Sequence, residues 1–244
     1  MLTLTDFAPA EVAAAGGHNL LVKHGDSGKA AQPSRTLDPG KVVLIRPSTT
    51  ATGIFGKLDH GAKGALESAH QGTVILDDAT RFDPAILDGI RNAHDAKRVR
   101  LYKGRDIAPN VNEPADFRLI IGTRGQDLRK ISGPLLDRID ITTETAESTQ
   151  ADPAALAAAR EAQANRLTAH GHATNAAAPL SLLLGALHPG RTALHALDED
   201  LDRARVSLRG YLRILRLSWT LADLAGQTTP GAEEIEAARA LRSF

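Results

Sequence analysis

The stretch QGTVILDDATRF, residues 71–82, runs an apolar segment directly into two adjacent carboxylates, Asp77 and Asp78. A short continuous apolar run bounded by turn residues and charges is typical of a strand buried on both faces of a parallel sheet. Carboxylates at the end of such a strand have two interpretations. In a P-loop fold the first would hold a nucleotide's magnesium ion and the second would activate water. Otherwise the stretch is a buried strand that runs into an acidic turn.

Similar runs on either side of this stretch predict the rest of a sheet. They are NLLVK (19–23), KVVLI (41–45) and FRLII (117–121). Segments with helical spacing lie between them, AKGALESAH (62–70) and DPAILDGIRNAH (83–94), and Pro84 after Asp83 is typical of a helix start. The alternation predicts an α/β core over residues 1–145, with a parallel sheet sandwiched by helices.

The pattern changes after AESTQADP (146–153), a polar segment that we interpret as a linker. Residues 154–244 contain no convincing strand pattern and predict an all-helical second part. The expected helices cover 154–169, about 177–187, 193–203, 205–225 and 230–242.

Composition limits the function without naming it. The 244 residues carry 29 basic and 29 acidic side chains, so contact with nucleic acid would need a local patch. The chain has no cysteine, which excludes thiolate catalysis and cysteine–zinc sites, and its nine histidines show no metal-ligand spacing. Without a signal-peptide pattern or a long apolar run, we expect a cytoplasmic protein with no membrane contact.

The segment HGDSGKAA, residues 24–31, resembles part of a phosphate-binding loop. A P-loop reads G-x-x-x-x-G-K-[ST], and Gly28 and Lys29 stand at its last Gly-Lys. Lys23 occupies the position of the first glycine, and Ala30 that of the closing hydroxyl residue. Half of a P-loop is common by chance, so this segment alone does not establish a nucleotide site.

Two arginine-bearing stretches also have two interpretations each. In ISGPLLDRIDI (131–141), Arg138 is either part of a surface salt-bridge cluster or an arginine that reaches a neighbouring subunit's phosphates. In the helix expected over 205–225, arginines 205, 209, 213 and 216 form a basic stripe beside an apolar one (208, 212, 215 and 219). That stripe is either a solvated helix face or a set of cations facing a phosphate pocket.

Taken together, four motifs resemble one family. AAAGGHNLLV (13–22), SAHQGTVILDD (68–78), ISGPLLDRIDI (131–141) and SLRGYLRILRLSWTLADLAG (207–226) occur in the order found in AAA+ ATPases similar to magnesium-chelatase subunit I. The resemblance is strongest to the competence-protein (ComM) branch. It implies an AAA+ P-loop core followed by a helical lid, ATP bound between the subunits of a ring, and, in the competence branch, a DNA branch-migration motor.

The resemblance assigns roles position by position. Lys29 would contact the β- and γ-phosphates beside Gly28, Asp77 would hold Mg²⁺, and Asp78 takes the place of the catalytic glutamate. Arg138 would be the arginine finger and Arg209 the lid arginine that senses the γ-phosphate.

The chain also departs from the family pattern. Ala30 removes a metal-binding hydroxyl, and Pro33 would fall in the second turn of the helix after the loop, at a cost of about 3 kcal/mol. Asp78 is one methylene shorter than glutamate, and a displacement of about 1 Å at a catalytic group costs on the order of a hundredfold in rate. Arg124 stands where the family has asparagine.

From these departures we expect an ATPase module of a homo- or hetero-oligomeric ring, in which the binding of ATP and Mg²⁺ is weak or lost and hydrolysis is weak or lost. The alternatives are a non-catalytic assembly or regulatory subunit and a DNA-remodelling motor subunit. The cysteine-bearing loop and the protease-like domain of the competence branch have no counterpart in the sequence.

Overall fold

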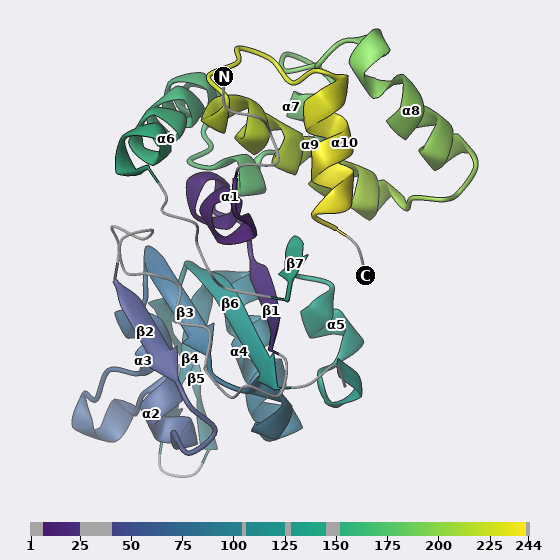
Figure 1. Ribbon diagram of the computed structural model, residues 1–244. Coiled ribbons are helices and arrows are strands. Elements are labelled where there is room, and N and C mark those ends of the chain that lie inside the picture. Colours follow the sequence, from purple (N-terminus) through teal and green to yellow (C-terminus); the bar gives the residue numbers. More distant parts are fainter. Residues whose placement is uncertain (1–6, 25–40, 104–105, 125–127, 145–151, 243–244) are drawn as a thin grey trace. The chain divides into compact units, whose positions relative to one another are not determined.

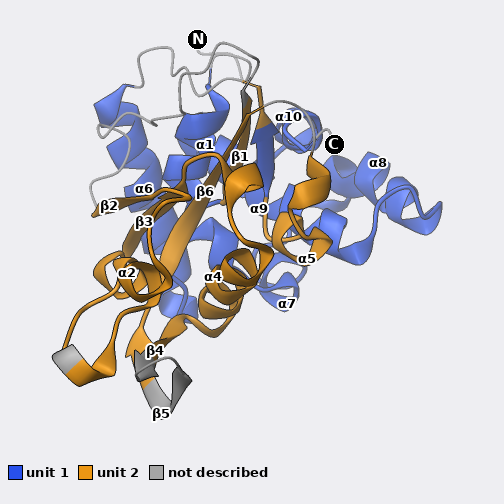
Figure 2. Cartoon of the chain, turned by 90° about the horizontal axis from the view of Figure 1, so that it is seen from below, with its two compact units in different colours: residues 1–18, 140–142, 147–244 blue, residues 19–139, 143–146 orange. Residues whose placement is uncertain are grey.

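The structure of the chain is a computed structural model that describes residues 7–24, 41–103, 106–124, 128–144 and 152–242. It divides into two compact units, and each is described by itself (Figure 2). Unit 2, the sheet unit, comprises residues 19–139 and 143–146; unit 1, the helical unit, comprises residues 1–18, 140–142 and 147–244.

The expected parallel sheet is confirmed. Its strand order is β2-β3-β6-β1-β7, and the neighbouring pairs β2–β3, β3–β6 and β6–β1 are parallel (Figure 1). The strands are β1 (Leu20–His24), β2 (Val42–Ile45), β3 (Gly72–Leu76), β6 (Phe117–Arg124) and β7 (Ile141–Thr143). All four apolar runs identified in the sequence therefore lie in strands of this sheet.

Helices of the sheet unit cover its apolar strands. They are α2 (Ala51–Phe55), α3 (Ala65–Ser68), α4 (Pro84–Ala96) and α5 (Gly133–Leu136), with short 3₁₀ turns at Leu58–His60, Ala79–Arg81 and Leu128–Lys130. Helix α4 begins where the sequence predicts, because the Asp83 side chain accepts a hydrogen bond from the Ala85 N–H (2.8 Å) and Pro84 needs no hydrogen-bond partner for its nitrogen.

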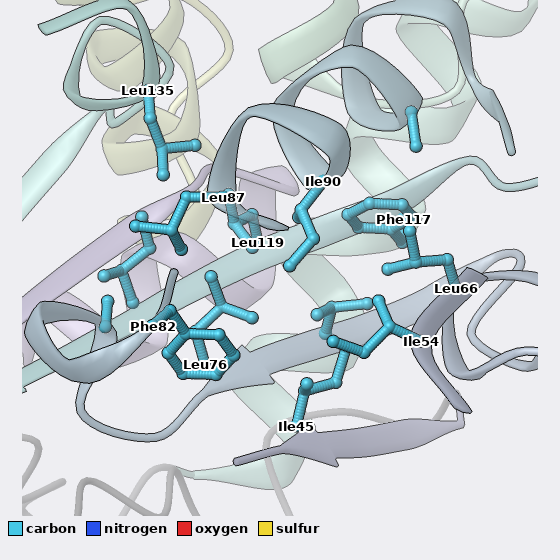
Figure 3. Packing of buried hydrophobic residues seen from close by; sticks show 14 of the residues in the cluster. Ile45, Ile54, Leu66, Leu76, Phe82, Leu87, Ile90, Phe117, Leu119 and Leu135 are labelled. Atoms are coloured by element: carbon cyan, nitrogen blue, oxygen red, sulfur yellow. The ribbon is translucent and has the colours of Figure 1, made fainter. Parts of the chain in front are cut away.

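One hydrophobic core joins these elements. Leu87 and Ile90 of α4 meet Leu76 of β3 and Leu119 of β6 (Figure 3), and all four side chains are almost completely buried. Burial of such a side chain contributes about 1.5–3 kcal/mol relative to leaving it exposed. The core therefore fixes the strands whose ends carry the polar residues discussed below.

A two-stranded antiparallel sheet was not anticipated from the sequence. It pairs β4 (Arg98–Lys103) with β5 (Asp106–Pro114), and the register shifts between Arg100 and Tyr102. Prolines 109 and 114 interrupt the alternation in β5, whereas polar and apolar residues do alternate over residues 98–101 of β4, a strand signal that is easily overlooked because the run is short.

The helical unit confirms an all-helical second part over the described residues after 152. Its helices are α6 (Pro153–Leu167), α7 (Leu180–Leu183), α8 (Arg191–Asp202), α9 (Leu208–Leu224) and α10 (Ala232–Ala240), with 3₁₀ turns at Thr168–His170 and Asn175–Ala177. Helix α9 is the centre of this unit: α6, α7, α8 and α10 all pack against it. Gly226 follows its end with a φ of 68°, a conformation that favours glycine.

One boundary between the compact units falls between residues 146 and 147, at the start of the expected linker, but the helical unit also contains residues 1–18 and 140–142. Helix α1 (Pro9–Gly16) belongs to the helical unit because it packs on α6 and α9, and its apolar side chains are buried there. Most of the expected linker lies outside the described residues. None of the helices in the described parts is both long and apolar enough to cross a membrane.

Candidate functional site

The carboxyl ends of three neighbouring parallel strands meet at one edge of the sheet. In register, Leu76 of β3 lies beside Ile121 of β6, which lies beside Leu21 of β1. Asp77 and Asp78 therefore leave β3 alongside the last residues of β6, which ends at Arg124. Ligands of open parallel sheets bind outside the carboxyl ends of the strands, so this edge is the candidate site.

Asp78 is buried and already has two partners at this edge. Its side chain accepts a hydrogen bond from the Thr80 hydroxyl (2.7 Å), and its Oδ2 lies 3.4 Å from Arg124 Nε. Only 5% of the Asp78 side chain is exposed, against 55% of Arg124. The Asp78 backbone is left-handed (φ 57°, ψ 65°), which is uncommon outside glycine and typical of functional or strained turns.

Asp77 also faces an arginine. Its Oδ2 lies 3.9 Å from Arg46 Nε, which follows β2 on the neighbouring strand. The Asp77 N–H donates to the Ile45 carbonyl (3.0 Å), so the backbone continues the β2–β3 ladder for one more residue. Each of the two carboxylates is therefore paired with a cation of the same unit.

A magnesium ion does not fit the described part of this edge. Mg²⁺ needs near-octahedral oxygen ligands and uses one or two carboxylates that are accessible to it. Here Arg46 and Arg124 stand beside those carboxylates, so a metal ion would have to displace the arginines to reach them. The sequence had given one signal of this arrangement, because Arg124 replaces an asparagine of the family.

Gly28 and Lys29, the expected phosphate-binding residues, lie outside the described residues, as does Ala30. Lys23, at the position of the missing first glycine, is the fourth residue of β1 and lies beside Thr123 of β6.

Arg138 pairs with a carboxylate of its own unit. Its Nε and Nη2 donate to the two oxygens of Asp95 on α4 (2.9 and 2.7 Å), and its Nη1 donates to the Pro134 carbonyl (2.9 Å). The hydrogen bonds from Arg138 lower the pKa of Asp95, and the same contact raises the pKa of Arg138. About a quarter of the Arg138 side chain (27%) is exposed, so this arginine is partly accessible to solvent while it is paired with Asp95.

Asn19 supports this arginine from the sheet, a contact that the sequence did not reveal. The Asn19 amide donates to the Arg138 carbonyl (2.8 Å), and its oxygen accepts from the Leu119 N–H (2.8 Å). The same amide lies 3.2 Å from His94 Nε2, and burial lowers the pKa of His94. The start of β1 thus holds β6, α4 and the segment after α5 together.

Arg209 lies in the first turn of α9, in the helical unit, and is exposed. The basic stripe to which it belongs is only partly a solvated face. Arg205 is exposed too, but Arg213 is 9% exposed and Arg216 is half-buried. The stripe turns inward because α9 is surrounded by the other helices of its unit.

Two family matches cover most of the chain. Residues 42–125 match the family described as "Magnesium chelatase, subunit ChlI", and residues 146–242 match "Magnesium chelatase, subunit ChlI C-terminal". The first match contains β2, β3 and β6, and the second contains α6 to α10. Residues 1–41, which include Lys29, lie outside both.

The chain is also similar to curated bacterial proteins. It is 32% identical over 235 residues to an uncharacterized protein of Mycobacterium tuberculosis, a match that covers 84% of this chain and 46% of that protein. The uncharacterized protein YifB of Escherichia coli is 26% identical over 184 residues, covering 55% of this chain and 36% of YifB. The chain thus spans about half the length, or less, of these relatives.

Proposed function

The chain belongs to the magnesium-chelatase-like family of AAA+ proteins, and from this membership we propose that it is a module that binds ATP between ring subunits with weak or lost hydrolysis. Membership of the family is the ground for proposing ATP binding and a ring. The residues of this chain are the ground for proposing slow hydrolysis.

The observation that best supports weak or lost hydrolysis is that both carboxylate oxygens of Asp78 already have partners. A carboxylate that activates water must offer an oxygen within hydrogen-bond reach of the attacking water. One Asp78 oxygen accepts from Thr80, and the other faces Arg124. Since the side chain is 5% exposed and shorter than glutamate, it is poorly suited to reach and deprotonate water.

Changes in the phosphate loop support the same conclusion. Ala30 has no hydroxyl with which to bind a metal ion, and the carboxylate of Asp77 lies next to Arg46. Lys29 and Gly28 still offer a positive charge and a close backbone approach to a phosphate. These changes weaken metal-dependent steps more than they weaken phosphate binding. We therefore expect ATP to be bound even where its hydrolysis is slow or absent.

Complete loss of hydrolysis would make the chain an assembly or regulatory subunit. The Arg138–Asp95 pair favours this second candidate, because an arginine finger must leave its own carboxylate before it can reach a neighbour's γ-phosphate. In that case the ring would form with nucleotide present, without turnover by this chain.

A comparison of ATP binding with ATP turnover tests the proposal. The unmodified protein should bind a fluorescent ATP analogue and show little phosphate release with Mg²⁺. Lys29→Ala should weaken the binding, whereas Ala30→Thr combined with Asp78→Glu and Arg124→Asn should raise turnover. Arg203→Asn is a matched control, because Arg203 pairs with Glu199 on the surface of α8 and its flank.

Brisk Mg²⁺-dependent hydrolysis by the unmodified protein, abolished by Lys29→Ala, would leave an active motor as the better explanation. Absence of ATP binding at millimolar concentration would remove the nucleotide from the proposal altogether.

A further inference from the structure

Three arginines of the helical unit gather around one carboxylate. Arg213 of α9 places its Nε 3.4 Å from Oδ1 of Asp140, and both side chains are 11% exposed. Arg216, one turn further along α9, and Arg242, which follows α10, both interact electrostatically with the same Asp140. We call Arg213, Arg216, Arg242 and Asp140 the arginine cluster.

Arg216 is held by a neutral partner. Its Nε donates to the Ala178 carbonyl (2.8 Å), and the side chain is half-buried. Burial lowers the pKa of Arg216, the Asp140 carboxylate raises it, and Arg213 lowers it further. Among the described residues, no carboxylate lies within ion-pair distance of Arg216, so the outer nitrogens of its fork remain available.

Arg242 lies against the start of α9. A Cβ added at Gly210 would lie 2.7 Å from Arg242 Nη1, so the glycine provides room for the guanidinium. The Nε of Arg242 is buried and has no hydrogen-bond partner. Burial lowers the pKa of Arg242, Arg213 lowers it too, and Asp140 opposes both effects.

Two other partly buried arginines of this unit meet their own carboxylates. Arg166 pairs with both oxygens of Asp223, and Arg239 pairs with Asp200 and Glu236. Arg216 and Arg242 lack such a partner in the part of the chain that the structure describes. Removing guanidinium groups from water without a counter-charge is costly, and the proximity of like charges adds to that cost.

We propose that the arginine cluster binds a phosphate group. Counting the described residues alone, three guanidinium charges and the one carboxylate of the cluster leave an excess of about two positive charges, and a phosphate monoester carries about −1.5 to −2 at neutral pH. A single carboxylate ligand would leave part of that excess unbalanced. The planar guanidinium forks of Arg216 and Arg242 also suit the bidentate recognition of phosphate oxygens.

This site is separate from the proposed ATP loop in sequence. It uses no residue of the 24–31 segment and neither Asp77 nor Asp78. A phosphate could come from the solution or from a nucleotide, and variants of Lys29 distinguish these two sources.

Calorimetric titration of the full chain with inorganic phosphate and with pyrophosphate, in a phosphate-free buffer of low ionic strength, tests the site. The unmodified protein should bind both. Arg242→Gln and Arg216→Gln should each weaken binding by about tenfold or more, as expected for the loss of a charge-assisted contact. Arg239→Gln is the matched control, since Arg239 has its own carboxylates, and should bind like the unmodified protein.

Thermal unfolding with and without pyrophosphate gives a second measurement. If the arginines had only a structural role, pyrophosphate would not change the Tm. Pyrophosphate should raise the Tm of the unmodified protein and of Lys29→Ala, but not that of Arg242→Gln. Without ligand, Arg242→Gln should unfold at the same or a higher temperature, because a half-buried cation with a buried, unpartnered Nε has been removed.

Three results would overturn the proposal. One is the absence of phosphate and pyrophosphate binding at millimolar concentration. Another is equal weakening by Arg239→Gln, which would indicate a diffuse charge effect. The third is loss of phosphate binding in Lys29→Ala with full retention in Arg242→Gln, which would place the anion at the 24–31 loop. ATP binding that depends on Lys29 while phosphate binding does not would leave both proposals standing independently.

Discussion

Arg124 and Asp78 show how a single substitution changes the chemistry open to a site. An asparagine at position 124 could orient water, whereas an arginine there neutralises the buried carboxylate next to it. The ion pair has one half-exposed member, so it contributes modestly to stability, about 1 kcal/mol or less. The larger effect of this ion pair is that Arg124 occupies the side of Asp78 at which a metal ion or a water molecule would bind.

We expect Arg124→Asn to let Mn²⁺ bind near Asp78. The substitution removes the cation beside Asp78 Oδ2 and supplies an amide oxygen, which is a suitable ligand for Mn²⁺. Electron paramagnetic resonance of Mn²⁺ should show bound metal for Arg124→Asn and none for the unmodified protein, with Arg203→Asn as control. Mn²⁺ bound by the unmodified protein and lost in Asp78→Asn would contradict this expectation.

The Asp95–Arg138 pair makes a pH-dependent contribution to stability. Arg138 lowers the pKa of Asp95 below its ordinary 3.8, with smaller effects of the same sign from His94 and Arg91. A carboxylate with a lowered folded-state pKa stabilises the protein fully above its unfolded-state pKa, and this stabilisation is lost as the pH falls through the folded-state value.

We therefore expect Asp95→Asn to cost up to about 1 kcal/mol at pH 7, because the pair is partly exposed. The difference from the unmodified protein should shrink below about pH 4. Urea unfolding at pH 7, 5 and 3.5 measures it, and Arg138→Gln should show the same pH profile. A difference that is constant across these pH values would mean that the ion pair is not its source.

At the scale of elements, a buried polar network joins α6 to α9. Arg166 of α6 donates to both oxygens of Asp223 on α9 (2.6 Å each) and to Asn175 Oδ1 (2.9 Å). Its guanidinium also lies 4.3 Å from the centre of the Trp219 ring. Only 1% of the Asp223 side chain is exposed, so this carboxylate depends on Arg166 for its counter-charge.

Arg166→Met should destabilise the protein by about 3–5 kcal/mol, the typical cost of leaving a buried charge without its partner. Arg203→Met, which breaks an exposed pair with Glu199 one turn away, should cost about 0.5 kcal/mol or less. Chemical unfolding monitored by circular dichroism compares the two. Equal effects would show that the network between α6 and α9 is not a main source of stability.

At the scale of the whole molecule, each nucleotide site of the proposed ring would need residues from two neighbouring subunits. A partly exposed Arg138 serves a neighbouring subunit only if its pair with Asp95 opens when that neighbour carries nucleotide. Assembly and the release of Arg138 are therefore coupled in this proposal.

Light scattering at high protein concentration should show a larger species when a non-hydrolysable ATP analogue is added. Asp95→Asn should favour that species, because it releases Arg138, and Arg138→Gln should weaken it. Arg91→Gln is a control on the same helix, since Arg91 contacts Asp95 without pairing with it as closely. A monomer in all conditions would count heavily against a ring.

The sequence by itself determined the parallel sheet and the helical second part. Uninterrupted apolar runs between turns and charges are local signals, and so are Asp83 and Pro84 at the start of α4. These features need no knowledge of distant residues. The family followed from four motifs in order, and the matches over residues 42–125 and 146–242 confirmed it.

Only the tertiary structure decided the partners of the charged residues. Strand register places Arg124 beside Asp78, and packing of α5 on α4 places Arg138 on Asp95. The surrounding helices bury Arg213 and half-bury Arg216. Each pairing joins segments far apart in the chain, and a helical pattern does not show which neighbours cover it. An arginine stripe therefore looks like a solvated face until the helices packed around it are known, because burial belongs to the assembled fold and not to the segment.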